Sequence, residues 1–264
     1  METSRYLDEY YGQGKEDGRL GSRHGSVEFI TTMGYIEKYL KPGHRVIEIG
    51  AGTGRYSHAL ARKGYTVDAV ELIQHNIDVF RQNTLDGENI TVTQGNALDL
   101  SGFPDNTYDI TLLLGPMYHL FTLEDKRQAL REAIRVTKPG GLVFVAYIIS
   151  DMAIMQAVFG YRGFSVAEHI KNGYIDPQTF AASSEPKLVF ELVRKEDIDT
   201  LMSGFPVKRL HYLASDGWSE MLRDDIDKAD DETFELYLQF HFAICERADM
   251  VGFTSHSLDI FRKD

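Results

Sequence analysis

The residues best suited to binding a ligand lie in one short stretch, Arg45–Tyr56. Here Gly50, Gly52 and Gly54 alternate with other residues after a β-branched run, and Glu48 stands two positions before the first glycine. Glycine lets the backbone bend sharply and approach a ligand closely because it has no Cβ. A helix that begins after such a turn directs its unpaired N–H groups toward that ligand. The stretch therefore predicts a buried strand, a glycine turn and a helix, with a ligand at the turn.

The glycine spacing narrows the class of ligand. A dinucleotide fingerprint is G-x-G-x-x-G, whereas the third glycine here comes one residue early. Glu71 follows about 20 residues later, at the end of an expected strand, where its carboxylate can accept hydrogen bonds from two ribose hydroxyls. The same residue would serve NAD, so Glu71 indicates a nucleoside without choosing between ligands. A glycine turn without a ligand and an exposed acid at a strand end are the alternative interpretations.

The pattern Glu48-x-Gly50-x-Gly52-x-Gly54 resembles motif I of the class I S-adenosylmethionine-dependent methyltransferases. The resemblance covers residues 25–150 and implies S-adenosylmethionine as cofactor, with S-adenosylhomocysteine as product. In that family the turn packs against the methionine and ribose parts of the cofactor. The implied contacts at the turn are Glu48, Gly50, Ala51, Gly52, Thr53 and Gly54.

The resemblance also assigns the adenine end of the cofactor to the segment after the third strand. The family usually has an acidic residue there, but this chain has Asn96. The amide oxygen of Asn96 can still accept a bond from the adenine amine, and Ala97 offers a backbone N–H. Asp99 is a second candidate for that bond. Leu72 and Leu114 complete the expected contacts.

The chain leaves the fourth strand through Gly115-Pro116-Met117-Tyr118 and His119. This is loosely similar to the (Asp/Asn/Ser)-Pro-Pro-aromatic motif of amino- and amide-methylating enzymes, although Gly115 has no side-chain oxygen to steer an amine. Tyr118 can face the sulfonium through a cation–π contact, and His119 can act as a general base. Alternatively, His119 caps the next helix or packs on the adenine edge. Alignment alone can drive methyl transfer, so a catalytic side chain is optional.

Alternating helices and strands must position these residues. The pattern predicts a doubly wound, mostly parallel seven-stranded sheet, and the resemblance implies that its last strand is antiparallel. After a first strand leading into the glycine turn, the expected strands are 65–70, 90–93, 108–114, 142–149, 207–214 and 257–262. Thr122-x-x-Asp125 predicts a capping box at the start of the helix after the fourth strand.

Segments outside this core are expected to cover the site. The resemblance implies that residues 1–24 form an amino-terminal flap over the cofactor, with Tyr11 and Arg23 as candidates for contacts with its methionine end; a solvated arm is the alternative. Residues 25–150 are the cofactor-binding core of a single domain spanning 1–264. Insertions at 151–190 and 216–250 form a helical lid, in line with the resemblance.

The second insertion carries a helical stripe with His241 and Cys245 four residues apart. Two potential ligands do not make a zinc site, so we expect no metal. The stripe either packs on the sheet or lines the acceptor pocket. In the second case Tyr237 and His241 are expected substrate contacts, with Glu246 and Arg247 as further candidates.

The composition restricts the partners. The 264 residues include 40 acidic and 28 basic ones, for a net charge of −12, which makes electrostatic binding to nucleic acid unfavourable. A lone cysteine excludes an internal disulfide framework, and no apolar run reaches the length of a signal-peptide core or bilayer span. We therefore expect a cytoplasmic methyltransferase acting on a small molecule. An NAD-dependent oxidoreductase and a non-catalytic S-adenosylmethionine-binding regulator are the alternatives, and the oligomeric state is not predicted.

Overall fold

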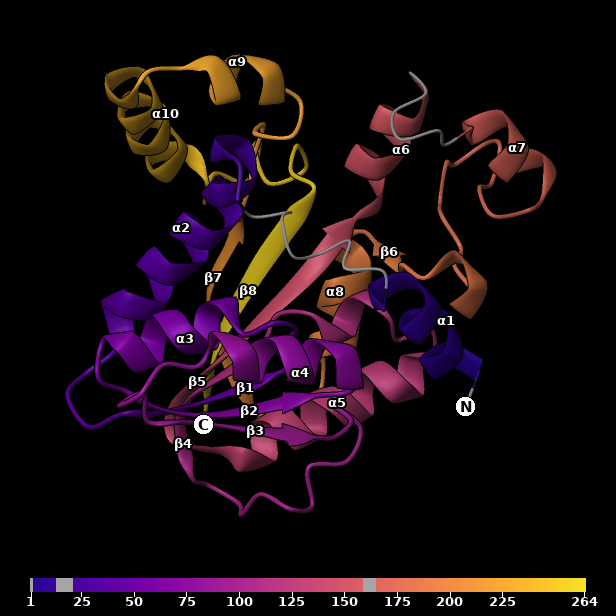
Figure 1. The fold of residues 1–264 in the computed structure, drawn as a ribbon. Helices are drawn as coiled ribbons and strands as arrows, with labels where there is room; N and C mark the ends of the chain where they lie inside the picture. Colours follow the sequence, from indigo (N-terminus) through magenta and orange to yellow (C-terminus); the bar gives the residue numbers. More distant parts are fainter. Residues whose placement is uncertain (1, 13–20, 159–164) are drawn as a thin grey trace.

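The computed structural model describes residues 2–12, 21–158 and 165–264, which surround one central sheet (Figure 1). Eight strands are found in these residues, in the order β3-β2-β1-β4-β5-β8-β7, and the short β6 pairs with β5. The strand bounds are β1 (Arg45–Ile49), β2 (Thr66–Glu71), β3 (Ile90–Gln94), β4 (Tyr108–Leu113), β5 (Thr137–Ile149), β6 (Leu192–Val193), β7 (Val207–Ala214) and β8 (His256–Lys263).

The strand directions determine where a ligand can bind. Strands β3, β2, β1, β4 and β5 pair in parallel, and β8 runs antiparallel to both of its neighbours, β5 and β7. The strand order reverses at β1, which lies between β2 and β4, and such a reversal leaves a crevice at the carboxyl ends of the strands. The expected doubly wound, mostly parallel sheet with an antiparallel last strand is confirmed.

Helices cover both faces of the sheet because its central strands are apolar on both sides. One buried cluster joins strand residues such as Ile47 and Leu113 to α5 and α8, and a second joins Val46 and Leu112 to α2 and α3. None of the described helices is both long and apolar enough to cross a bilayer. The helix bounds are α1 (Glu2–Tyr11), α2 (Arg23–Tyr39), α3 (Arg55–Arg62), α4 (Gln74–Asn83), α5 (Leu123–Val136), α6 (Ser150–Val158), α7 (Val166–Lys171), α8 (Lys195–Met202), α9 (Arg223–Lys228) and α10 (Asp231–Ile244), and the 3₁₀ helices η1 (Pro116–Tyr118) and η3 (Pro186–Leu188) complete the set.

Three details differ from the expected elements. The strand β6 was not expected, since two residues are too short to give a periodic signal. Strand β5 begins at Thr137 rather than Leu142, with a register irregularity between the two where Gly140 has a φ of 76°. Arg23 begins α2 instead of belonging to a loose flap. Of the expected capping box, the N-cap bond is present, because the Thr122 hydroxyl accepts from the Asp125 N–H at 3.0 Å; the Asp125 carboxylate accepts from the same hydroxyl instead of from the Thr122 N–H.

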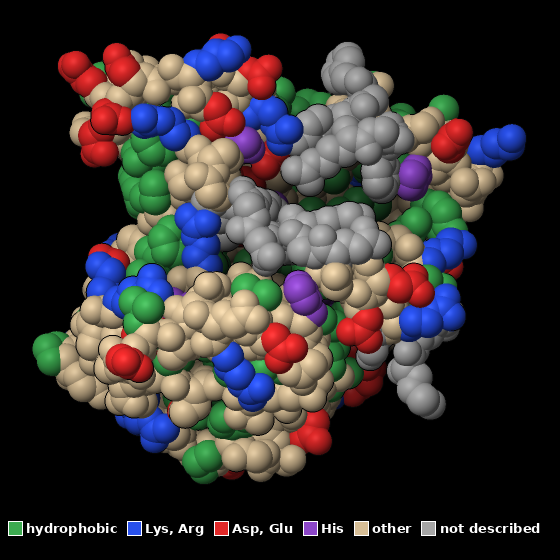
Figure 2. Space-filling view, viewed as in Figure 1, with side chains coloured by type: hydrophobic (Ala, Val, Ile, Leu, Met, Phe, Trp, Pro, Cys, Tyr) green, Lys and Arg blue, Asp and Glu red, His purple; other side chains and the backbone are tan. Residues whose placement is uncertain are grey.

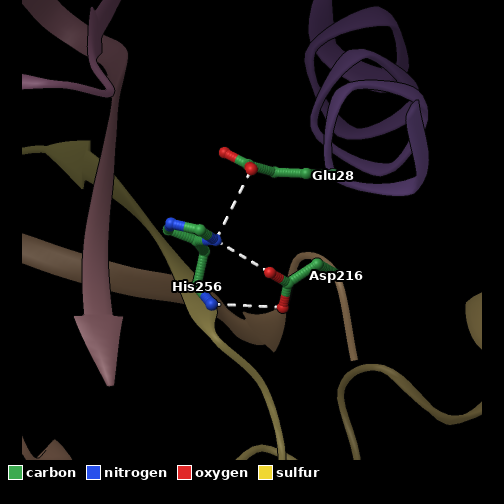
Figure 3. A group of neighbouring side chains, drawn as sticks. All are labelled: Glu28, Asp216 and His256. Carbon is green, nitrogen blue, oxygen red and sulfur yellow. Dashed lines mark hydrogen bonds and ion pairs between the residues drawn. The ribbon is translucent and has the colours of Figure 1, made fainter. Parts of the chain in front are cut away.

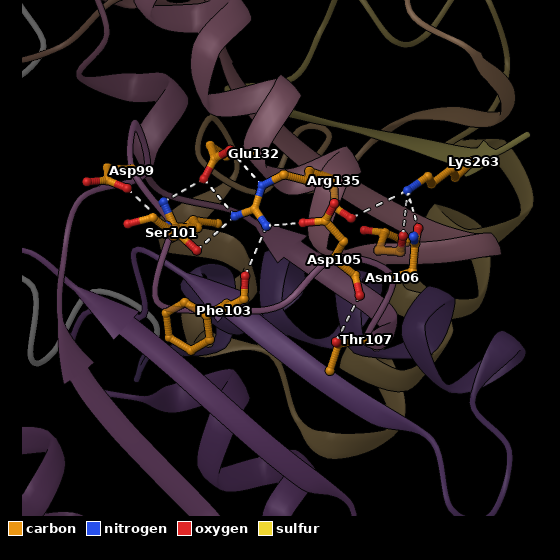
Figure 4. A network of polar contacts seen from close by, with 11 residues as sticks. Asp99, Ser101, Phe103, Asp105, Asn106, Thr107, Glu132, Arg135 and Lys263 are labelled. Atoms are coloured by element: carbon orange, nitrogen blue, oxygen red, sulfur yellow. Dashed lines mark hydrogen bonds and ion pairs between the residues drawn. The ribbon is translucent and has the colours of Figure 1, made fainter.

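The loop between β3 and β4 is held in place by one arginine of α5 (Figure 4). The Arg135 guanidinium donates to the carbonyl oxygens of Leu100 and Phe103 at 2.8 and 2.9 Å. It also pairs with Asp105 at 2.5 Å and with Glu132 at 2.8 Å. These bonds fix the loop against α5, and the first residues of the same loop reach the candidate site.

Candidate active site

The glycine turn joins β1 to α3 and adopts backbone angles that favour glycine. Gly50, Gly52 and Gly54 have φ values of 74°, 55° and 89°. A Cβ on Gly50 would lie 2.6 Å from Cδ of Pro116, so the close approach of the loop after β4 also requires glycine there. A Cβ on Gly52 would meet no atom within 4 Å. Gly50 therefore serves packing, whereas Gly52 borders open space at the turn.

Glu71, at the end of β2, is directed at the glycine turn. Its Oε2 accepts a hydrogen bond from the Gly52 N–H at 2.8 Å. Its Oε1 accepts from the Ile73 N–H at 2.9 Å and from Asn76 Nδ2 at 3.1 Å. These bonds fix the orientation of a buried carboxylate beside the turn, as the spacing of Glu71 and the glycines predicts.

Glu48 ties the end of β1 to the first turn of α3. Its Oε2 accepts from the Ser57 N–H at 2.9 Å and also from the Ser57 hydroxyl. Burial raises the pKa of the Glu48 carboxyl to about 8, against the opposing effect of the two Ser57 bonds, and the charge of Glu71 adds to the increase. The residue therefore stabilises the turn and is also a titratable group at its centre.

Asn96 follows β3 and forms a turn of its own. Its Oδ1 accepts from the Leu98 N–H at 3.0 Å, which exposes the faces of Ala97 and Leu98 to the same space as Glu71. Asp99, the alternative candidate, instead accepts from the Ser101 N–H at 2.9 Å and does not line that space. Of the two, the structure brings only Asn96 to the site.

These residues form one end of a cavity of about 960 Å³ at the carboxyl edge of the sheet. Ligand pockets commonly have volumes of roughly 300–1,000 Å³, so this cavity is large for a single small ligand. Its other end is walled by α1, by η1 and the chain that follows it, and by the first insertion. The residues from these parts include Leu7, Tyr10, Tyr11, Leu114, Tyr118, His119, Ile154, Ala157, Tyr174 and Phe190.

His119 connects the amino-terminal helix to the first insertion. Val189 O lies 2.8 Å from His119 Nδ1, and Tyr11 Oη lies 2.9 Å from Nε2. A carbonyl can only accept, so Nδ1 carries the proton and Nε2 of the neutral ring accepts from Tyr11. The Phe190 ring packs against both Tyr10 and His119, at centroid distances of 5.3 and 5.4 Å. These contacts hold α1 in place over the cavity.

Three residues that the sequence analysis did not consider, Glu28, Asp216 and His256, meet in space (Figure 3). Asp216 Oδ2 lies 2.7 Å from His256 Nδ1, and Glu28 Oε2 lies 3.5 Å from the same nitrogen. Glu28 and His256 line the cavity, and the Tyr118 and His256 rings are 5.7 Å apart. Within the described residues, potential metal ligands come this close as a group of three only here.

No local motif marks these three residues, because they come from α2, from the segment after β7 and from the start of β8. One topological signal was present. The end of β7 and the start of the antiparallel β8 must share the edge of the sheet that holds the glycine turn. Polar residues at those two positions, Asp216 and His256, could have been selected on that ground.

The structure does not bring Arg23, Tyr237 or His241 to the cavity. Arg23 donates to Asp231 at 2.5 Å, which places it on the surface between α2 and α10. Tyr237 and His241 line a separate pocket of about 20 Å³. Helix α10 contacts α2, and the His241 ring lies against Gly217, in the segment after β7, without lining the cavity.

Other candidates from the second insertion also have structural partners. Glu246 accepts from Tyr35 Oη at 2.6 Å, and Arg247 pairs with Asp249 at 2.8 Å. Cys245 is buried. Of residues 216–250, Asp216 meets His256 next to the cavity and Glu220 lines it. The first insertion supplies most of the lid that the structure describes.

Comparison with known proteins is consistent with this geometry. Residues 47–145 match the family model described as a methyltransferase domain. Over 174 residues the chain is 26% identical to the methyltransferase GfsG of Streptomyces halstedii, covering 62% of this chain and 61% of that protein. Over 136 residues it is 30% identical to the ubiquinone/menaquinone biosynthesis C-methyltransferase UbiE of Saccharophagus degradans, covering 48% and 52%. The matched stretches thus span little more than half the length of these curated relatives.

Solved structures show the same fold. A methyltransferase of Thermotoga maritima, titled as a possible histamine N-methyltransferase, aligns with a TM-score of 0.59 at 18% identity and covers 98% of both chains. A methyltransferase of Methanosarcina mazei aligns with a TM-score of 0.57 at 16% identity, covering 87% of this chain and 96% of its own. The methyltransferase domain at residues 47–145, the named relatives and the shared fold together indicate a class I S-adenosylmethionine-dependent methyltransferase.

Proposed function

We propose that this protein binds S-adenosylmethionine in the cavity and transfers its methyl group to a small-molecule acceptor. The main support for this proposal is that the two ends of one cavity are lined by different kinds of residue. One end has the glycine turn, Glu71 and Asn96, whereas the other has apolar and aromatic walls. A volume of about 960 Å³ leaves room for an acceptor beside a nucleoside.

The first end fits the adenosine part of the cofactor. Glu71 Oε2 accepts a hydrogen bond from the Gly52 N–H, and a carboxylate oxygen has a second lone pair for a ribose hydroxyl. Leu72, Ala97 and Leu98 offer apolar surface for the purine, and Asn96 offers an amide at its edge. Such a set suits a neutral ribose and a base.

The turn and the exit from β4 fit the methionine part. Glu48, Gly50, Ala51 and Thr53 line the cavity on this side, and Leu114 continues the wall. Gly54 does not line the cavity, and we assign it to the start of α3. The bound cofactor supplies an electrophilic methyl group on a positively charged sulfur.

The aromatic side chains then serve binding and alignment. Tyr118 can face the sulfonium through its ring. Alignment of acceptor and methyl group can contribute roughly 7–11 kcal/mol to lowering the barrier. Tyr11 and His119 hold α1 over the cavity and exclude water. Since Nε2 of His119 accepts from Tyr11 and Nδ1 donates to Val189, we assign His119 to this closure rather than to proton transfer.

Several observations support a small-molecule acceptor. The lid side of the cavity is lined by aromatic and aliphatic groups, including Tyr174, Phe190 and Ile154. The net charge is −12, and Figure 2 shows acidic and basic side chains mixed over α9 and α10, with no broad basic patch in that view. The curated relatives include enzymes named for quinone biosynthesis. We place the protein in the cytoplasm, in keeping with its one cysteine, which is buried.

Two measurements test the proposal. Calorimetric titration with S-adenosylmethionine, S-adenosylhomocysteine and NAD is expected to show binding of the first two alone. Incubation with tritiated-methyl S-adenosylmethionine and a methanol extract of metabolites is expected to transfer tritium to a small molecule. Binding of NAD alone would contradict the cofactor assignment. Binding of S-adenosylhomocysteine without any transfer would favour a non-catalytic regulator.

A further inference from the structure

We propose that His256 is the catalytic base of the methyl transfer and that Asp216 is its positioning residue. This inference rests on the proposed function, because it concerns the acceptor end of the same cavity. It also specifies the class of acceptor. The acceptor is a small molecule that attacks through an O–H or N–H group whose proton must be removed, rather than one that is already a free nucleophile.

The bonds of Asp216 fix the orientation of the imidazole. Its Oδ1 accepts from the N–H groups of Ser255 and His256, at 2.9 and 3.1 Å, and from the Thr254 hydroxyl. Its Oδ2 lies 2.7 Å from His256 Nδ1. Asp216 is buried, and a carboxylate that accepts two backbone N–H bonds on Oδ1 presents Oδ2 to the imidazole as an acceptor. His256 Nδ1 must then carry the proton, so Nε2 is the basic atom of the neutral ring.

The fold places this ring at the required edge of the sheet. Strand β8 is antiparallel to β5, and His256 pairs with Ile148 in their register. Its first residue therefore lies where the parallel strands end, at the same edge as Glu48 and Glu71. His256 lines the cavity, and its ring is 5.7 Å from that of Tyr118, which we place at the sulfonium. The pair formed by Asp216 and His256 thus lies at the acceptor end of the cavity.

Glu28 supplies a second negative charge from α2. Its Oε2 lies 3.5 Å from His256 Nδ1, and its side chain is buried. Among the described residues, the titratable groups in contact with His256 include Asp216 from the segment after β7, Glu28 from α2 and Tyr118 from η1. Two carboxylates beside one imidazole favour its protonated form, so they stabilise the ring after it has accepted a proton.

The proposed step couples methyl transfer to removal of the acceptor's proton. The lone pair of the acceptor oxygen or nitrogen forms a bond to the methyl carbon, and the methyl–sulfur bond breaks with its electron pair left on the sulfur. His256 Nε2 takes the proton from the acceptor atom and becomes an imidazolium. Asp216 and Glu28 stabilise that cation until the proton leaves to water. No oxidant, reductant or further co-reactant takes part.

The tautomer of His256 can be tested without an acceptor. We expect long-range ¹H–¹⁵N spectra of the full chain, labelled on histidine and loaded with S-adenosylhomocysteine, to show His256 protonated at Nδ1. His256→Gln assigns the signal, and Asp216→Asn is expected to remove the strong hydrogen bond of that proton. An Nε2-protonated His256 in the wild type would overturn the proposal.

Kinetics test the role of the base. In the tritium assay with the methanol extract, His256→Gln is expected to lower transfer by about a hundred- to ten-thousand-fold, the usual contribution of a general base. Its dissociation constant for S-adenosylhomocysteine should stay within about twofold, which separates failure of the base from failure of the cofactor site. The matched control is His211→Gln, since His211 Nδ1 pairs with Glu246 at 2.8 Å outside the cavity. It is expected to keep full activity.

The pH profile separates a positioning role from a structural one. In Asp216→Asn, the ascending limb of the profile should move to lower pH, because a neutral amide no longer favours the imidazolium. Glu28→Gln should move it in the same direction, and this variant keeps the test available if Asp216→Asn does not fold. A uniform loss of rate without movement of the limb would overturn the positioning role. Loss of wild-type transfer on chelation, restored by Mn²⁺, would also overturn the proposal, because the three residues would then hold a cation.

Discussion

The two ends of the cavity are assembled in different ways. The end that we assign to the cofactor comes from residues 48–98, where Glu48, Glu71 and Asn96 lie at or just after the ends of three parallel strands. The acceptor end combines Tyr11, Glu28, Tyr118 and His256 with the first insertion, so its parts come from α1, α2, η1 and β8. Binding chemistry at the first end is therefore fixed by local sequence. At the second end it depends on how distant segments pack, and acceptor specificity can change there without altering cofactor binding.

The largest effect that we expect concerns the centre of the cofactor end, in Glu48→Gln. Because burial raises the pKa of Glu48 from 4.5 to about 8, the folded protein binds this proton more tightly than the unfolded chain. The contribution of the Glu48 proton to the free energy of unfolding is thus fully present below about pH 4.5 and is lost as the pH rises toward 8. Glutamine does not titrate, so the variant should gain stability relative to wild type over this range, by the order of a few kcal/mol.

Chemical denaturation at several pH values would measure this difference. Glu37→Gln is the matched control, since Glu37 is exposed and pairs with Lys63 on the surface. It should leave the pH dependence as it is in wild type. A Glu48→Gln curve parallel to that of wild type would show that Glu48 is charged in the folded protein.

The next effect concerns the ribose. Glu71→Ala is expected to raise the dissociation constant for S-adenosylhomocysteine by about tenfold to a few hundredfold, from the loss of one or two charge-assisted bonds. Calorimetry measures the change. Asp99→Ala is the control, because Asp99 binds Ser101 and lies outside the cavity, and its affinity should be that of wild type. An unchanged constant in Glu71→Ala would contradict the ribose assignment.

A smaller effect tests the open space at the turn. In Gly52→Ala the left-handed backbone should cost about 1 kcal/mol of unfolding free energy. The new methyl group points into space that we assign to the cofactor, so the dissociation constant should rise by about tenfold. Gly64→Ala has the same strain, with a φ of 89° and nothing within 4 Å of its Cβ, but it lies outside the cavity. Equal affinity of the two variants would show that the cofactor does not use the turn.

The smallest expected effect concerns Arg23, for which the sequence and the structure predict different results. Arg23 was an expected contact of the methionine end, yet it pairs with Asp231 at the surface. Arg23→Ala should therefore change the affinity for S-adenosylhomocysteine by less than about twofold. A tenfold loss would return Arg23 to the site and would require α2 to move.

Local sequence patterns were sufficient to predict the structure where the residues of a single strand, turn or helix indicate it. The β-branched run before Gly50 predicted a buried strand that leads into a glycine turn and a helix, and the alternation of strands and helices predicted a mostly parallel, doubly wound sheet. The register of Glu71 with the glycines predicted that the two would lie together, as the Glu71–Gly52 bond shows. The antiparallel β8 followed from the family resemblance rather than from its residues.

Patterns failed where a side chain's neighbour is distant in the chain. A helical stripe such as that of His241 shows that one face is buried, but it does not show against which surface. The contact between Glu28, Asp216 and His256 depends on the packing of α2 against the β7–β8 edge. No spacing rule encodes it, although the topology of the sheet restricts it.

The most direct test of the account is a crystal structure with S-adenosylhomocysteine. We expect the ribose hydroxyls within hydrogen-bond distance of Glu71, the purine beside Ala97 and Leu98, and the sulfur directed toward Tyr118 and His256. A cavity without the compound at saturating concentration, or a nucleoside turned so that its sulfur faces away from Tyr118, would contradict it.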